Sequence, residues 1–227
     1  MRFNRDDPST WGFFSPLIIA HDVGRCRDRS TAVVGGNCPV GPPLLGIAEL
    51  EELPQGLFGS ARASALAAVD RRHNHNALII ADLSNDPTYA EVLRETFGSR
   101  MIGLQISRHG DGMNFERRPV GTALMLIYTV GRSRLLELLH SELQSDLVRM
   151  VDDANSRRAY EQLMNLETEI RDSGIIYKCL PGQHDDLGIS CAMLAWAARH
   201  PHLRDWVGAL APRWSSPPQR FNWAAFT

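Results

Sequence analysis

Short apolar runs alternate along this chain with stretches of helical spacing, and the pattern predicts a mixed α/β fold. Three β-type runs come first, at residues 14–22, 29–36 and 43–53, with turn-like breaks between them. Runs separated in this way are typical of an antiparallel meander. Two further apolar runs, at 77–86 and 100–107, predict buried strands later in the chain.

Helical spacing of small and apolar residues predicts the helices. The stretches concerned are 60–75, 87–98, 133–147 and about 184–199. Gly98 is expected to close the second of them. Residues 156–170 predict a helix that runs into a strand, and residues 169–180 a hairpin that turns at Asp172-Ser173-Gly174.

The order of these elements favours one α/β domain with a mixed sheet and helices on both faces. We place that domain at residues 16–205. An N-terminal lead at 1–15 precedes it, and an irregular tail rich in Pro and Trp follows at 206–227. The polar residues 108–120 are expected to form a loop.

Composition narrows the class of protein. The 227 residues are 44% hydrophobic and 22% charged, with a net charge of −2, as in an ordinary soluble domain. A nucleic-acid contact would therefore need a local basic patch. The four cysteines form no CxxC pair, so zinc is not expected. No signal peptide is visible, and the longest apolar run, near 187–198, is too short to span a bilayer, so a cytoplasmic protein is expected.

Four aspartates stand where an apolar element meets a turn. Asp22 and Asp82 end the first and fourth apolar runs, and the pair Asp185-Asp186 opens the last helix. Taken singly, each fits a turn, a helix cap or the positive end of a helix dipole. If the first and fourth strands are neighbours, their aspartates lie side by side, and a helix packed across the sheet adds a third carboxylate. Such a cluster is relieved by protonation or by a divalent cation, and Mg²⁺ prefers oxygen ligands.

Three segments carry a resemblance to a known family: IIAHDVGRCRDRSTAVVGG, ALIIADLSNDPTYAEVLRETFG and GQHDDLGISCAMLAWA. In order and spacing they resemble the three acidic motifs of the C-terminal nuclease domain of phage large terminases. GRSRLLELLHSEL and GIIYKCLPGQHDD are similar to that family's helix, hairpin and start of the last helix. The resemblance covers about residues 16–200. It implies a ribonuclease-H-like, or RuvC-like, α/β fold with a mixed five-stranded sheet flanked by helices.

The resemblance also implies an activity, namely metal-dependent endonucleolytic cleavage of double-stranded DNA during genome packaging. Carried over by position, Asp22 becomes a ligand that bridges two ions, and Asp82 becomes the ligand of the second motif. Asp185 or Asp186 is the third, with a preference for Asp186, which shares a helix face with Ser190. The implied cofactor is Mg²⁺ or Mn²⁺, with two ions when substrate is bound. Two such ions about 3.5–4 Å apart activate a water and stabilise the leaving oxygen.

Basic residues near these aspartates are candidates for phosphate contacts, which would offset the lack of overall positive charge. Arg25, Arg27 and Arg29 surround a turn after the first aspartate, where a solvated loop explains them equally well. Arg108 lies in the polar segment, for which an ordinary surface loop is the simpler explanation. His184 fits either a residue that orients a ligand or a water, or a helix cap.

The partners that the resemblance implies are double-stranded DNA and other packaging proteins, namely a small terminase, a portal and a separate ATPase. Large terminases carry a Walker loop in their ATPase domain, but no GxxxxGK[ST] occurs in these 227 residues. The chain is therefore expected to cut DNA without powering its movement, in the cytoplasm of a bacterial host and away from the membrane.

Two other functions stay open. Many relatives carry a further Asp where this chain has Ile189, so the second ion is expected to bind weakly. That departure and the mild acidity favour a catalytically weak or inactive ribonuclease-H-like module that binds nucleic acid or protein. HDVGRCRDRSTAVV also loosely resembles the first phosphate loop of actin-like nucleotide binders, but those proteins duplicate the fold and need a longer chain.

Overall fold

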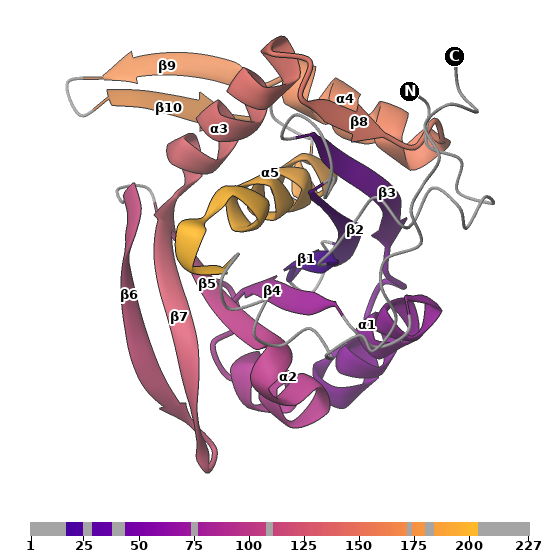
Figure 1. Cartoon of the computed structure of the whole chain (residues 1–227), viewed down its shortest axis with the longest axis vertical. Helices are drawn as coiled ribbons and strands as arrows, with labels where there is room; N and C mark the ends of the chain where they lie inside the picture. The colour runs from indigo at the N-terminus through magenta and orange to yellow at the C-terminus, as the bar shows by residue number, and fades with distance from the viewer. Residues whose placement is uncertain are drawn as a thin grey trace, which may run out of the picture.

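A mixed sheet with helices on both faces organises the chain (Figure 1). A computed structural model describes residues 17–24, 29–37, 44–73, 77–107, 111–171, 174–179 and 184–203. The α/β architecture expected from the sequence is confirmed. The expected number of five strands is wrong, because the sheet formed by these residues has eight.

The sheet contains β1 (Ile18–Asp22), β2 (Thr31–Asn37), β3 (Leu45–Glu52), β4 (Leu78–Asp82), β5 (Met101–Ser107), β6 (Asp111–Val120), β7 (Ala123–Gly131) and β8 (Val148–Met150). The helices are α1 (Gly59–Arg72), α2 (Tyr89–Phe97), the 3-10 turn η2 (Gly98–Arg100), α3 (Arg132–Gln144), α4 (Ala154–Met164) and α5 (Asp186–Arg199). A separate hairpin joins β9 (Glu167–Arg171) to β10 (Gly174–Lys178). Each strand and helix expected from the pattern is present to within a few residues.

The strand order is β6-β7-β5-β4-β1-β2-β3-β8. β1, β2 and β3 form the expected antiparallel meander. β4 pairs with β1 in parallel, and His21 lies opposite Ala81. Since parallel neighbours end at the same edge of a sheet, the carboxyl ends of β1 and β4 lie side by side. This meets the condition that the sequence analysis set for a site shared by Asp22 and Asp82.

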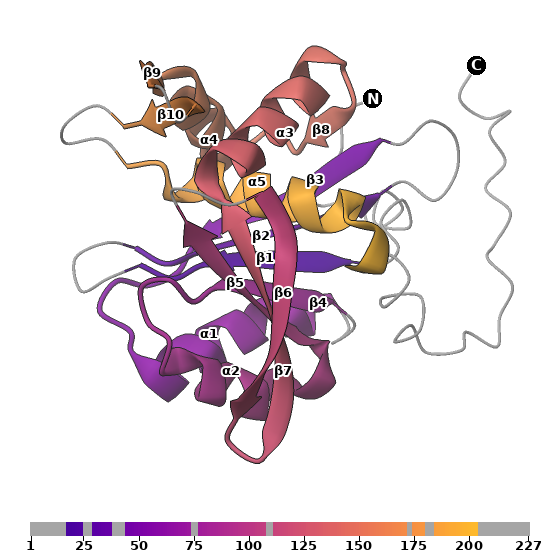
Figure 2. The same cartoon turned by 90° about the vertical axis from the view of Figure 1, so that its left-hand side faces the viewer.

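Helices cover the two faces unequally, as Figure 2 shows. α1 and α2 pack on one face over a core that includes Ile19, Ile79 and Leu66. On the other face α5 lies against β1 and β2, with α3 and α4 packed outside it. Every residue of α5 from Leu187 to Ala198 is buried. A helix enclosed on all sides has no polar face, which explains why this is the most apolar helix of the chain.

The polar segment 108–120 is not the loop expected from its composition. Residues 111–120 form β6, which pairs antiparallel with β7 at the edge of the sheet. Arg117 and Glu116 are exposed. An edge strand with solvent on its faces needs no apolar alternation, so its sequence reads as a loop. Gly121, with φ of 57°, makes the turn into β7.

A close approach between β2, β3 and α5 requires glycine at position 35. A Cβ there would overlap the carbonyl oxygen of Gly46 and come within 3.0 Å of Leu194 Cδ2. Gly35→Ala is therefore expected to destabilise the protein by about 1–3 kcal/mol, because the added methyl forces a backbone shift. Gly103→Ala is the comparison variant, since the atoms nearest its Cβ belong to the side chains of Leu83, Ile127 and Met125 rather than to the backbone, and side chains adjust at a lower cost than backbone. Urea unfolding measures both, and equal losses would contradict the prediction.

The expected lead at 1–15 and tail at 206–227 lie outside the described residues, so those boundaries stay predictions. Arg25, Arg27 and Arg108 also lie outside them. The helices of the described segments are all too short or too polar to cross a lipid bilayer.

Candidate active site at the ends of β1 and β4

Asp22 and Asp82 come from the adjacent parallel strands β1 and β4. Asp22 is partly buried, and Asp82 is only 5% exposed. Side chains alternate along a strand, so Asp22 lies on the same face as Ala20, and Asp82 on the same face as Ile80. Ala20 and Ile80 both belong to the core that contains α5. Both aspartates therefore face the helix that carries the third acidic motif.

Two contacts fix the N-terminal part of α5 against the sheet. Thr31 is the cross-strand partner of Asp22. Its hydroxyl shares a 2.6 Å hydrogen bond with Ser190 Oγ and donates a 3.3 Å bond to the carbonyl oxygen of Asp186. The residue next to Asp22 thus holds the start of the helix, and Asp186 is brought to the end of β1.

The electrostatics of Asp22 reflect this convergence. Burial raises its pKa well above the usual value, and the nearby carboxylates of Asp82 and Asp186 raise it further, while Arg132 lowers it in part. Three acids from distant parts of the chain therefore share one environment.

Asp82 is held by its own loop. Its Oδ1 accepts bonds from the backbone N of Ser84 at 2.9 Å and from Ser84 Oγ at 2.6 Å. Burial raises the pKa of Asp82, and the Ser84 hydrogen bonds lower it only in part. Since Ser84 occupies one side of the carboxylate at Oδ1, Asp82 is fixed in orientation beside Asp22.

The two adjacent aspartates at the start of α5 have different surroundings. Asp185 forms an ion pair with Arg132, the first residue of α3. Asp186 is close enough to Asp22 to raise its pKa. The positive charge of Arg132 also lowers the pKa of Asp82, so this guanidinium lies within the field of the acidic cluster.

The donor set suits a hard divalent ion, because every candidate ligand is a carboxylate. Among the described side chains, however, no three or more His, Cys, Asp or Glu residues already surround a metal position. The carboxylates of Asp22, Asp82 and Asp186 share one electrostatic environment without forming a finished ligand cage. Ile189, at the position where the family resemblance implies a further acid, is packed in the core and 3% exposed.

A groove of about 410 Å³ opens beside Asp186. His184 is exposed and lines it, and so does Arg29, whose Nη1 lies 2.5 Å from Glu52 Oε2. Two of the basic or imidazole side chains expected to contact DNA thus reach the same groove. The other three, Arg25, Arg27 and Arg108, fall in segments that the structure does not describe.

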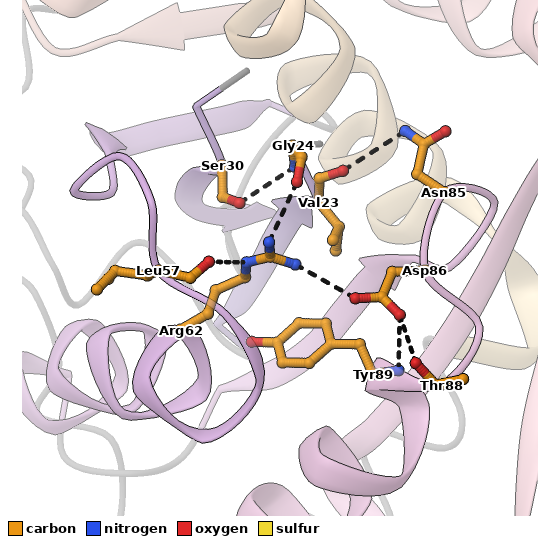
Figure 3. A network of polar contacts seen from close by, with 9 residues as sticks. All are labelled: Val23, Gly24, Ser30, Leu57, Arg62, Asn85, Asp86, Thr88 and Tyr89. Carbon is orange, nitrogen blue, oxygen red and sulfur yellow. Dashed lines mark hydrogen bonds and ion pairs between the residues drawn. The ribbon is translucent and has the colours of Figure 1, made fainter. Parts of the chain in front are cut away.

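A buried arginine on the other face of the sheet ties together the loops that follow the two strands (Figure 3). Arg62, in α1, is 4% exposed. Its Nη2 donates to the carbonyl of Gly24, two residues after Asp22, and its Nε donates to the carbonyl of Leu57, each at 3.2 Å. Its Nη1 lies 3.7 Å from Asp86, in the loop after β4.

Neighbouring groups complete this network. The guanidinium of Arg62 lies over the ring of Tyr89, 5.0 Å from its centroid. Asn85 Nδ2 donates to the carbonyl of Val23 at 3.5 Å, and the backbone N of Gly24 donates to Ser30 Oγ at 3.1 Å (Figure 3). The side chain of Asn85, in the loop after Asp82, is therefore bonded directly to the backbone that follows Asp22.

Two arginines that support the aspartates, Arg132 and Arg62, were not predicted from the sequence. Arg132 directly follows a buried strand, which is the same signal that singled out Asp22 and Asp82. Arg62 is a charged residue on a helix face whose other members, Leu66 and Val69, are buried. A charge at such a position indicates a buried polar partner, and that signal was available from the sequence.

No protein-family model and no curated protein matches this chain. Among solved structures, the large terminase nuclease of thermophilic phage G20c with bound magnesium matches with a TM-score of 0.56 and 19% identity, over 80% of this chain and 82% of its own. The same nuclease with bound cobalt gives 0.54 and 18%, over 80% and 82%. A third structure of it gives 0.52 and 20%, over 81% and 84%. The chain therefore has the ribonuclease-H-like fold of phage large terminase nuclease domains.

Proposed function

We propose that this protein is a divalent-metal-dependent endonuclease of the terminase type, which cleaves double-stranded DNA. One observation carries the proposal. Two neighbouring strand ends and the start of the most buried helix bring Asp22, Asp82 and Asp186 into one environment, on the fold of the G20c nuclease. Three carboxylates at this place do not stabilise the sheet, since burying them close together raises the free energy of the folded state unless a cation pairs with them.

Asp22, Asp82 and Asp186 would hold the metal, with Mg²⁺ or Mn²⁺ as the ion and room for two when substrate is present. The likeness to a nuclease solved with magnesium and with cobalt supports this choice. When bound, such ions activate a water and stabilise the leaving oxygen of a phosphodiester. The charge of the ion would also draw the three carboxylates together, which the protein alone does not do because they repel one another.

The residues of the chain then have separate tasks. Asp22, whose pKa is raised by the charges of both Asp82 and Asp186, would bridge ions. Asp185 would act through Arg132, holding that guanidinium beside the site, where it can contact a phosphate oxygen. Asp186 rather than Asp185 is the proposed ligand, because it is Asp186 whose charge raises the pKa of Asp22.

The partners follow from the reaction. Double-stranded DNA is the proposed substrate, and packaging proteins such as a small terminase, a portal and a separate ATPase are the proposed assembly. The net charge of −2 gives the protein no general attraction for DNA. Binding would therefore depend on the ions and on local basic residues.

A plasmid-nicking assay tests the function. Supercoiled DNA incubated with the wild-type protein and Mn²⁺ or Mg²⁺ is expected to become nicked and linear, and EDTA is expected to stop the reaction. If neither ion supports cleavage, the inactive binding module becomes the better explanation. Binding of ATP to the wild-type protein would instead support the nucleotide-binding alternative.

Stability should depend on pH and metal through Asp22. A carboxyl whose pKa is raised on folding binds its proton more tightly in the folded state, so stability falls as pH rises from the ordinary Asp range through the raised pKa. Asp22→Asn is therefore expected to raise the Tm of the metal-free protein at pH 7.5, by roughly 2–4 °C per kcal/mol recovered. The gain should shrink toward pH 4, where the wild-type carboxyl is protonated.

With Mn²⁺ present, the Tm of the wild type is expected to exceed that of Asp22→Asn, since the ion binds the wild type and stabilises it. Its effect should weaken as pH falls, because protons compete for the same oxygens. Differential scanning fluorimetry with and without Mn²⁺ measures both effects. A metal-free Tm for Asp22→Asn equal to or below that of the wild type at pH 7.5 would contradict the prediction.

A further inference from the structure

At the edge of the groove beside Asp186, the carboxylate of one glutamate lies between two arginines. Glu52, the last residue of β3, pairs through Oε2 with Arg29 and through Oε1 with Arg158 of α4. All three side chains line the groove. The Asn155 side-chain amide donates a 2.8 Å bond to the carbonyl of Leu50, which fixes α4 on β3 and so holds Arg158 beside Glu52.

The three side chains differ in their access to solvent. Glu52 is 16% exposed, whereas Arg29 is 55% and Arg158 is 48% exposed. Partial burial raises the pKa of Glu52, but hydrogen bonds from Arg158 and Arg29 lower it more strongly, so it lies below the usual value. Glu52 is therefore charged at neutral pH, and both guanidinium groups remain within reach of a ligand in the groove.

Formal charges in the groove sum to a small negative value. Arg29 and Arg158 contribute +2, and Glu52, Glu161 and Asp186 contribute −3, giving −1 with His184 neutral. A phosphate is repelled by that balance. One divalent ion at the Asp186 end changes it to +1, and an arginine fork is well suited to phosphate oxygens.

We propose that Glu52 keeps Arg29 and Arg158 in place as a stand-in for phosphate, so that the groove accepts the backbone of a DNA strand only when the neighbouring acidic site holds metal. The inference rests on the proposed nuclease function and adds the path of the strand and the control of its binding. In this scheme Arg158 contacts a phosphate of the DNA strand. Glu52 opposes that contact as long as the acidic site holds no metal.

Binding without metal tests the role of Glu52. Anisotropy of a short fluorescent DNA duplex is measured in EDTA over a range of salt. Glu52→Gln is expected to tighten binding about threefold and to steepen the slope of log K against log salt by about 0.9, the value for one added phosphate contact. Glu51→Gln is the matched control, because Glu51 pairs with Arg72 instead and is expected to change neither quantity.

Cleavage with Mn²⁺ tests the role of Arg158. Arg158→Gln is expected to raise KM at least about threefold, as for one lost phosphate contact, with kcat near that of the wild type. Arg157→Gln removes the same charge from the same exposed helix without touching the groove, and its KM is expected to stay unchanged.

These measurements separate failure of the inference from failure of the function. If Glu52→Gln binds no more tightly than Glu51→Gln, or Arg158→Gln matches Arg157→Gln, the groove is not the path of the strand, even if the wild type cleaves DNA. If the wild type cleaves nothing, the proposed nuclease function is wrong, while the metal-free comparison still decides whether Glu52 opposes phosphate binding.

Discussion

Replacing Asp22 or Asp82 with asparagine is expected to lower the rate of DNA cleavage by at least about 100-fold. Asparagine keeps the size of the side chain but removes the charge that would hold the ions. Even partners in the outer shell of a metal contribute about 10- to 100-fold, so direct ligands should contribute more. Asp186→Asn is expected to behave in the same way, measured as the initial rate of plasmid nicking in Mn²⁺.

Asp185→Asn is the matched control for this series. It stands next to Asp186 but pairs with Arg132, so its substitution is expected to cost far less activity than that of its neighbour. Circular dichroism and Tm establish that each variant is folded. Full activity in Asp22→Asn or Asp82→Asn would remove the carboxylate cluster from the mechanism, and a larger loss in Asp185→Asn than in Asp186→Asn would exchange their roles.

Arg62→Met is expected to lower the free energy of unfolding by about 2–4 kcal/mol. Methionine keeps much of the apolar stem, but the carbonyls of Leu57 and Gly24 lose their donor, and an unsatisfied buried acceptor costs about 1–3 kcal/mol. Because those contacts tie down the backbone after Asp22, cleavage should fall as well, with a larger effect on kcat than on KM. Urea unfolding and steady-state kinetics measure the two effects.

Arg71→Met provides the control for this change, since Arg71 lies on the same helix and is exposed. Its stability and activity are expected to stay near those of the wild type. Arg62→Lys keeps the charge and a single donor nitrogen in place of the guanidinium fork, so it should recover part of the lost activity if positioning of the loop is the cause. Equal stability of Arg62→Met and Arg71→Met would show that the network in Figure 3 contributes nothing measurable.

Some strands could be predicted from the sequence and others could not. β1, β4 and β5 lie inside the sheet, so their apolar runs are continuous and bounded by turn residues. β6 lies at an edge and carries polar side chains, and β8 has three residues. Neither has an apolar pattern of its own: β6 is a strand because it pairs with the apolar β7 that follows it, and β8 because it pairs with β3, which lies far earlier in the chain.

The same division applies to the candidate site. Asp22, Asp82 and the pair Asp185-Asp186 could be named as candidates because an acid at the end of an apolar element is conspicuous in the sequence itself. The groove was not, since Glu52 and Arg158 are ordinary surface residues until β3 and α4 are placed together. The preference for Asp186 over Asp185 also draws on contacts with residues far away in the chain, since Asp185 pairs with Arg132 and Asp186 raises the pKa of Asp22.

The sequence by itself determined the α/β class, the central strands, the buried last helix and which acids are candidates for the site, because these depend on the spacing of residues that are near in the chain. Only the tertiary structure decided which strands are neighbours, which acid meets which base, and where a groove opens. Those features depend on contacts between residues far apart in the chain, and no local pattern encodes the distance between them.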